Sequence, residues 1–284
     1  MPGVAVEDLL GLWSDELCGA KARLRPLFLQ AGTAASAGAF LDGLLGPERR
    51  KTGWMRAEAA GDTGLWRQQA VLGRTSWDAE ALRDVVRDYA LDPLGEPDAT
   101  LVIDETGFLK QGKASCGVGR QYTGSAGKIT NCQSGVFAAY ASSKGHAFID
   151  RRLYLPKDWT GNPDRLAKAY VPEDVRFATR PAIAAAMVRR AIDAGVHFTW
   201  VAADSVYGVG ELEMALRRAG KGYVLGVTGS HHFTSWSLTL SVSGTAEEIE
   251  GAADGGLEPL VGGRRDHGAA ALRLGLPGTG RPRS

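Results

Sequence analysis

The sequence predicts an α/β protein in which a mixed sheet follows a helical N-terminal region. The first hundred residues carry apolar side chains at helical spacing between glycine breaks, whereas short apolar strand-like runs alternate with amphipathic segments from Thr100 onward. The order of the later segments is β-β-β-α-β-α-β. A hairpin start followed by alternating helices and strands is typical of a mixed sheet with helices packed on it.

The N-terminal region contains four stretches with a helical pattern, at residues 6–32, 36–46, 53–61 and 76–92. In the last stretch we expect Ser76 to be the N-cap, with Asp78 and Glu80 in the first turn. The run PLGEPDA follows, and its two prolines and glycine predict a boundary. Residues 1–97 are therefore expected to form a separate helical region.

The second part, residues 98–236, is expected to contain the sheet. Predicted strands cover 100–104, 131–142, 146–156, 198–204 and 222–229, and predicted helices cover 179–195 and 210–220. The second and third strands read as a hairpin joined by the turn SKG, and the run PKDWTGNPDR reads as a loop. For the first helix, Thr179 can be the cap, Pro181 suits the first turn, and Gly195 can end it.

The last part of the chain has a different composition. No Phe, Trp or Tyr follows Trp236, and 27 of the 34 residues from Gly251 onward are Gly, Ala, Arg, Pro or Leu. Such a segment cannot easily build a core. We expect residues 237–284 to be the remnant of an insertion followed by a frameshifted tail; a natural disordered tail is the alternative.

Composition narrows the class of protein only a little. Lys and Arg total 33 against 32 Asp and Glu, so the net charge of +1 neither indicates nor excludes a nucleic-acid partner. Three widely spaced cysteines, Cys18, Cys116 and Cys132, argue against a zinc site or a disulfide framework. The N-terminus lacks a basic signal-peptide region and no apolar run reaches ~18 residues, so we expect a cytoplasmic protein without a membrane span.

Two aspartates are the candidate catalytic residues. Asp104 and Asp204 each follow a predicted buried strand, in the contexts DETG and DSVYG. If the strands are neighbours, the two carboxylates lie close together and resist ionisation unless a cation lies between them. Mg²⁺ accepts one or two carboxylates together with water and substrate phosphate. A turn or capping role is the alternative for each aspartate, and Glu105 should point to the opposite face of its strand.

Other polar residues are weaker candidates. Lys110, Arg120 and Lys128 lie in or near a glycine-rich stretch and can contact phosphate, although a solvated loop explains them equally well. That stretch lacks the Gly-Lys-Ser/Thr of a phosphate loop. The pair His231-His232 reads as a polar turn. A further group of basic residues reads equally well as helix-surface charge or as DNA contacts, namely Arg189, Arg190, Arg217, Arg218 and Lys221.

Long segments of the chain resemble insertion-sequence transposases of the DDE superfamily endonuclease type. The resemblance lies in the segments KTGWMRAEAAGD, WDAEALRDVVRDYALDPLGEPDATLVIDETG, VIDETGFLKQGKASCGVGRQYTGSAGKITNCQSGVFAAYASSKGHAFIDRRLYLPKDWT, FATRPAIAAAMVRRAIDAGVHFTWVAADSVYG and GYVLGVTGSHHF, and it extends over roughly residues 15–250. It implies a ribonuclease H-like fold in which Asp104 and Asp204 match the first two catalytic acids. Both would bind Mg²⁺ or Mn²⁺ for strand cleavage and transfer, with transposon terminal repeats and target DNA as partners and a homo-oligomer as one option.

The sequence departs from that family at its end. The third catalytic acid of the family is a Glu on a helix well beyond the YVLGVTG strand, and the resemblance stops near Gly251. Glu247, Glu248 and Glu250 stand in a different context from that residue. We therefore expect a truncated, inactive transposase. The alternatives are a non-catalytic DNA-binding remnant that occupies transposon ends and, more remotely, a two-carboxylate hydrolase of another substrate.

Overall fold

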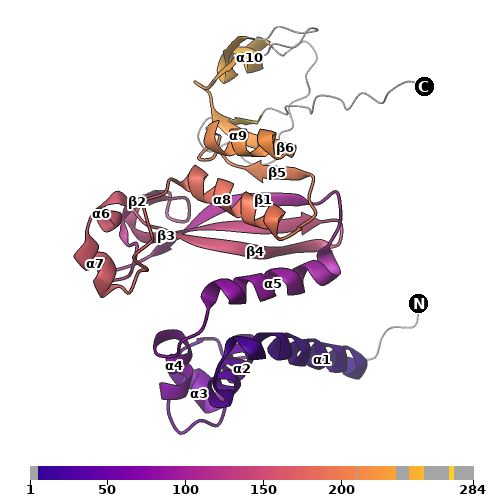
Figure 1. Ribbon diagram of the computed structural model, residues 1–284, viewed down its shortest axis with the longest axis vertical. Coiled ribbons are helices and arrows are strands. Elements are labelled where there is room, and N and C mark those ends of the chain that lie inside the picture. The colour runs from indigo at the N-terminus through magenta and orange to yellow at the C-terminus, as the bar shows by residue number, and fades with distance from the viewer. Residues whose placement is uncertain (1–5, 209, 235–242, 253–268, 272–284) are drawn as a thin grey trace. The chain divides into compact units, whose positions relative to one another are not determined.

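A computed structural model describes residues 6–208, 210–234, 243–252 and 269–271 (Figure 1). The chain divides into two units, Met1–Tyr89 and Ala90–Ser284. Most of the segment 237–284, for which a frameshifted tail was expected, lies outside the described residues.

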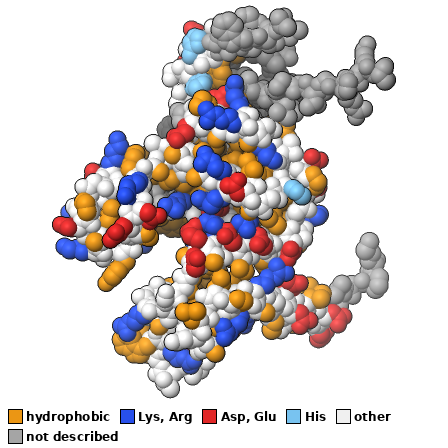
Figure 2. All heavy atoms as spheres, in the orientation of Figure 1, with side chains coloured by type: hydrophobic (Ala, Val, Ile, Leu, Met, Phe, Trp, Pro, Cys, Tyr) orange, Lys and Arg blue, Asp and Glu red, His pale blue; other side chains and the backbone are white. Residues whose placement is uncertain are grey.

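The first unit is helical, as the apolar spacing predicted. Its helices are α1 (Val6–Leu24), the 3₁₀ turn η1 (Arg25–Leu27), α2 (Ala31–Leu45), α3 (Gly53–Ala59), α4 (Trp66–Gly73) and the first part of α5 (Ala79–Leu94). Pro26 lies in η1, and the expected helix 6–32 ends there. Several large apolar side chains of α1 are exposed (Figure 2), among them Leu10 and Trp13.

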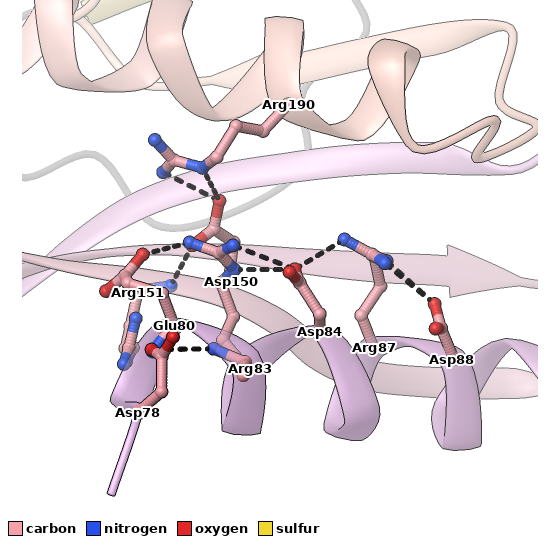
Figure 3. A network of polar contacts seen from close by, with 10 residues as sticks. Asp78, Glu80, Arg83, Asp84, Arg87, Asp88, Asp150, Arg151 and Arg190 are labelled. Carbon is pink, nitrogen blue, oxygen red and sulfur yellow. Dashed lines mark hydrogen bonds and ion pairs between the residues drawn. The ribbon is translucent and has the colours of Figure 1, made fainter. Parts of the chain in front are cut away.

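The cap of α5 differs from the expectation. Asp78, not Ser76, caps this helix, because its Oδ1 accepts hydrogen bonds from the amides of Glu80 (2.8 Å) and Ala81 (3.0 Å). The helix also continues through Pro93 to Leu94, beyond the expected end. Ion pairs line its polar side, with Arg83 beside Glu80 and Asp84 and with Arg87 beside Asp84 and Asp88 (Figure 3).

The second unit is built on a mixed sheet. Its strands are β1 (Thr100–Leu109), β2 (Gly119–Thr123), β3 (Lys128–Ser142), β4 (Gly145–Tyr154), β5 (Trp200–Ala203), β6 (Gly222–Thr228) and β9 (Ala269–Ala271). β3 pairs antiparallel with β1, β2 and β4, whereas β1, β5 and β6 run parallel to one another. The order β4-β3-β1-β5-β6 is that of a ribonuclease H-like sheet, so the predicted fold class is confirmed.

Two helices cover one face of this sheet. They are α8 (Arg180–Asp193) and α9 (Gly210–Arg218), and their apolar sides share one buried core with alternate residues of the strands (Figure 1). The predicted signals of α8 are confirmed. The Thr179 hydroxyl accepts from the Ala182 amide (3.1 Å), Pro181 lies in the first turn, and Gly195 takes a φ of +71° just past the end.

A small lobe lies beside β2. The run expected to be a loop contains two short helices, α6 (Lys157–Thr160) and α7 (Pro163–Lys168). Trp159 is buried there with Val118 and Leu155, and its indole N–H donates to the Val118 carbonyl oxygen (2.7 Å). Acidic and basic side chains are interspersed over this lobe (Figure 2).

The remaining described elements are short. They are β7 (His232–Thr234), which pairs with β8 (Ser243–Thr245), and α10 (Ala246–Ala252). Among the helices of the described part of the chain, none combines the length and the apolar character needed to cross a membrane.

Candidate functional site

The parallel pairing of β1 and β5 brings Asp104 and Asp204 together. The register runs from Thr100 beside Trp200 to Ile103 beside Ala203, and the residue that follows each of these two segments is the aspartate. Neighbouring strands lie about 4.8 Å apart, and residues at matching positions of a parallel pair point to the same face. The two carboxylates therefore lie side by side on the face opposite α8 and α9, which is the arrangement that the sequence predicted for neighbouring strands.

One detail of the expectation is wrong, because Asp104 does not end its strand. β1 continues to Leu109, and β3 satisfies its backbone there, with Thr106 opposite Gly135 and Leu109 opposite Cys132. β5, in contrast, stops at Ala203. Asp104 thus lies at the point where β1 loses its parallel neighbour, so its side chain is exposed at a step in the sheet.

Each aspartate is held locally by a backbone amide. Asp104 Oδ1 accepts from the Glu105 amide (2.7 Å), and Asp204 Oδ1 accepts from the Val206 amide (3.0 Å). The Asp204 carbonyl oxygen also accepts from the Tyr207 amide (3.1 Å), which closes a tight turn after β5. Within the described part of the chain, Oδ2 of neither carboxylate has a hydrogen bond or an ion pair to another residue.

Close backbone contact fixes the turn after Asp204 against β6. A Cβ atom at Gly226 would lie 2.8 Å from the Ser205 nitrogen and 3.0 Å from the Asp204 carbonyl carbon. A Cβ atom at Gly208 would lie 2.0 Å from the Gly226 carbonyl oxygen. Only glycine fits at these two positions without displacement of the backbone, so both glycines determine where Asp204 sits.

The electrostatics of the pair favour a cation. Desolvation by surrounding protein raises the pKa of the Asp204 carboxyl, although the side chain reaches solvent, and the negative charge of Asp104 raises it further. The Val206 amide and the Arg180 guanidinium act in the opposite direction. A hard divalent cation between the carboxylates would relieve this repulsion, and its preference for carboxylate oxygen matches the donors present.

The described residues supply two of these ligands and no third. Among them, no group of three or more His, Cys, Asp or Glu side chains is arranged to hold a metal ion. Glu248 has another role, since its Oε2 accepts from the Thr245 amide (2.8 Å) while the Thr245 hydroxyl accepts from the Glu248 amide (3.2 Å). This reciprocal pair is a capping box at the start of α10.

Glu105 points to the face opposite Asp104, as alternation along the strand predicted. Its Oε2 accepts from the buried Tyr207 hydroxyl (2.7 Å), and Arg180 at the start of α8 places its Nε 3.9 Å from Oε1. Burial raises the pKa of the Glu105 carboxyl against the lowering by Tyr207 and Arg180. The roles of Tyr207 and Arg180 were not predicted from the sequence. For Tyr207, its position three residues after Asp204 is the one sequence signal that could have indicated a role near the site.

The three predicted phosphate contacts do not share one face. Arg120 pairs with Asn131 and the Lys110 amide donates to the Asn131 carbonyl oxygen (3.0 Å), so Arg120 and Lys110 lie on the face of Asp104. Lys128 pairs with Thr123 and lies three residues before Asn131 on β3, so its side chain is on the other face. Arg120 also lines a hollow of about 220 Å³ together with Lys113 and Arg165.

Three of the five remaining basic candidates have structural partners. Arg190 pairs with Asp150 (2.8 Å, Figure 3), Arg217 with Glu213 (2.5 Å), and the Lys221 ammonium donates to the Phe198 carbonyl oxygen (2.7 Å). In the histidine pair, His231 packs its ring against Phe233 and His232 begins β7. The three cysteines are free thiols, exposed at Cys18 and buried at Cys132.

Comparison with known proteins gives the same assignment as the geometry. A model of the family described as DDE superfamily endonuclease matches residues 23–237. The chain is also 29% identical over 198 residues to a probable transposase for insertion sequence element IS701 from Microchaete diplosiphon. That match covers 67% of this chain and 48% of the relative, so the chain spans about half the length of the curated relative it matches. The chain belongs to the DDE superfamily endonuclease family.

Proposed function

We propose that this chain acts on DNA at the ends of an insertion sequence, cleaving a strand and transferring it to a target. The observation that carries the proposal is the register of β1 and β5, which sets Asp104 beside Asp204 on one exposed face. Family membership supplies the reaction class, and the relative named as a probable insertion-sequence transposase supports it.

Asp104 and Asp204 are the residues that would hold a divalent cation, Mg²⁺ or Mn²⁺. A cation held there would supply activation of a water or a 3′-hydroxyl and stabilisation of the leaving oxygen of a phosphodiester. The chain itself contributes orientation. The Val206 amide holds one oxygen of Asp204, and the Glu105 amide holds one oxygen of Asp104.

DNA would cross the sheet on the face of the aspartates. Lys110 follows Asp104 by six residues along β1, which corresponds to about 20 Å of extended strand. Lys110 and Arg120 would contact phosphates there, with Lys113 and Arg165 in the adjacent hollow. Lys128 would contact DNA only if the DNA passes round the end of the β2–β3 hairpin. The helical region 1–97 would bind the terminal repeats, with 98–236 as the catalytic part and 237–284 as a remnant and tail.

A second function is binding to transposon ends without cleavage. The observation that favours it is the absence of a third suitably placed acid among the described residues, together with the use of Glu248 in the cap of α10. Such a protein would compete with an active transposase for the same DNA ends. Oligomerisation is compatible with either function.

One experiment separates the two functions. Purified full chain is incubated with labelled duplex DNA that carries the terminal repeats flanking its gene, with Mg²⁺, Mn²⁺ or EDTA, and both binding and nicking are scored. Metal-dependent nicking that is abolished in Asp104→Asn and Asp204→Asn supports the first function. Repeat-specific binding without nicking supports the second. Absence of any preference for the repeats would contradict both.

A salt titration of the same binding tests the proposed phosphate interactions. Removal of one phosphate interaction should reduce the slope of log K against log salt by about 0.9 for duplex DNA. We expect Arg120→Ala to reduce the slope by about that amount. The matched control Arg217→Ala removes an arginine paired with Glu213 on α9 and should leave the slope unchanged. Equal slopes for wild type and Arg120→Ala would remove Arg120 from the interface.

A further inference from the structure

A hydrogen bond on the covered face of the sheet joins the two halves of the aspartate site. Glu105 directly follows Asp104 in β1, and its Oε2 accepts from the Tyr207 hydroxyl at 2.7 Å. Tyr207 follows Asp204 by three residues and is fully buried. The contact therefore links the strand of the first aspartate to the turn of the second, although the residues are far apart in sequence.

The same tyrosine is part of the turn that orients Asp204. Its amide donates to the Asp204 carbonyl oxygen (3.1 Å), and the Val206 amide donates to Asp204 Oδ1 (3.0 Å). Since the ring of Tyr207 is packed in the core behind the sheet, the position of the ring sets the position of the turn. A shift of the ring would move the backbone that holds Asp204.

Glu105 is restrained from a second side as well. The Arg180 Nε lies 3.9 Å from Glu105 Oε1, and the Arg180 guanidinium stacks over the Tyr154 ring, 4.7 Å from its centroid. Arg180 begins α8, whose first turn Thr179 caps. The carboxylate of Glu105 thus lies between the hydroxyl of Tyr207 and the guanidinium of Arg180 at the start of α8.

A partly buried carboxylate at this position has a cost that an apolar residue would avoid. Burial penalises the charged form, and the bond to Tyr207 and the proximity of Arg180 only offset that penalty. Leu101 and Ile103, on the same side of β1, show that apolar side chains pack well against this core. The choice of Glu at the position that directly follows Asp104 therefore calls for a role other than packing.

We propose that Glu105 and Tyr207 are positioning residues, whose hydrogen bond holds Asp104 and Asp204 at the separation that a divalent cation requires. This inference rests on the proposed function, since it assumes that the two aspartates bind a cation. Neither residue touches the cation or the substrate. Both act from the opposite face of the sheet, through the backbone of β1 and through the turn after β5.

The test measures Mn²⁺ affinity of the full chain by electron paramagnetic resonance of free Mn²⁺, without any need for DNA cleavage. Tyr207→Phe removes only the hydroxyl, and we expect it to weaken Mn²⁺ binding by about 10- to 100-fold, the usual effect of losing a partner that orients metal ligands. Glu105→Leu removes the acceptor and should weaken binding to the same extent. Glu105→Gln keeps an acceptor oxygen and should restore affinity to within about threefold of wild type.

Tyr140→Phe is the matched control. Tyr140 is equally buried in the same core. Its hydroxyl lies within donor distance of the carbonyl oxygens of Glu96 (2.8 Å) and His197 (2.9 Å), to which its one hydrogen can donate, and it accepts from the Glu96 amide (2.9 Å). Its strand position pairs with Leu101, three residues before Asp104. Loss of this hydroxyl should lower thermal stability at least as much as Tyr207→Phe does and leave Mn²⁺ affinity unchanged.

Each outcome decides a different point. Wild-type affinity in Tyr207→Phe, alongside abolished affinity in Asp104→Asn, would overturn the positioning role and leave the proposed function standing. Equal loss of affinity in Tyr140→Phe and Tyr207→Phe would also overturn it, because general loosening of the core would then explain both. No Mn²⁺ binding by the wild-type chain at millimolar concentration would overturn the proposed metal site itself. If Tyr207→Phe does not fold, as judged by circular dichroism, the Glu105→Leu and Glu105→Gln pair decides the question.

Discussion

Removing one charge from the aspartate pair should stabilise the metal-free protein. Asp204→Asn keeps an oxygen that can accept the Val206 amide while it abolishes the repulsion with Asp104. Two unit charges ~5 Å apart repel by about 0.8 kcal/mol in water and by about four times that in an environment of intermediate dielectric constant. Since both side chains reach solvent, we take the lower end and expect a gain of ~1 kcal/mol in the free energy of unfolding.

The assay is thermal unfolding in EDTA and in Mn²⁺. In EDTA, ~1 kcal/mol corresponds to an increase of about 2–4 °C in Tm for a chain of this size. In Mn²⁺ the order should reverse, because only the wild type has both ligands and gains stability from binding. Asp104→Asn should give the same increase in EDTA, and the double variant should gain little more than either single variant, since one repulsion is removed in every case.

The pH dependence of this effect has a definite sign. The raised pKa of Asp204 means that the folded protein binds this proton more tightly than the unfolded chain, so wild-type stability falls as the pH rises above the ordinary value of 3.8. The asparagine of the Asp204→Asn variant does not titrate. The difference between variant and wild type should therefore be small near pH 3 and fully developed at pH 7. A variant less stable than wild type in EDTA at pH 7, or a pH-independent difference, would refute the electrostatic argument.

Three further substitutions test the packing around the site. A Cβ at Gly107 would lie 2.1 Å from Thr123 Oγ1, so Gly107→Ala should lower the free energy of unfolding by about 1–3 kcal/mol. Adding Thr123→Gly to this variant should recover part of the loss. If the losses of the two single variants simply add in the double variant, the clash is not the cause. Thr179→Ala should cost ~1 kcal/mol by urea unfolding through loss of the α8 cap, whereas Thr179→Ser should be close to wild type; equal losses in both would point to packing instead. Trp159→Phe should cost about 1–3 kcal/mol, because the Val118 carbonyl oxygen loses its donor, and an unchanged Tm would show that water replaces the indole N–H.

The sequence was sufficient for the features that depend on local pattern. The order of strands and helices along the chain from β1 to β6, except for β2, α6 and α7, follows from apolar runs, and the three signals of α8 follow from capping chemistry. The sequence predicted that Asp104 and Asp204 lie close together if their two strands are neighbours, and the pairing of β1 with β5 meets that condition. Resemblance to the transposase family added the family, which the family match confirms.

Features that depend on distant partners were missed. β2 reads as a glycine-rich loop because its strand form relies on pairing with β3, and the extension of β1 to Leu109 relies on the same strand. The cap of α5 was missed for a local reason, because the amides of two nearby residues donate to Asp78 and not to Ser76. The bond between Glu105 and Tyr207 joins residues from two segments that only the fold brings together.

The pairing of β1 with β5 also has a kinetic consequence. Thr100 and Trp200 are neighbours in the sheet but are separated by roughly 100 residues of chain, and closing a loop of that length costs about 4 kcal/mol of chain entropy. The β3–β4 hairpin, joined by a tight turn, has no such barrier. We therefore expect the antiparallel half of the sheet to form early, and the carboxylate pair to form only when β5 pairs with β1.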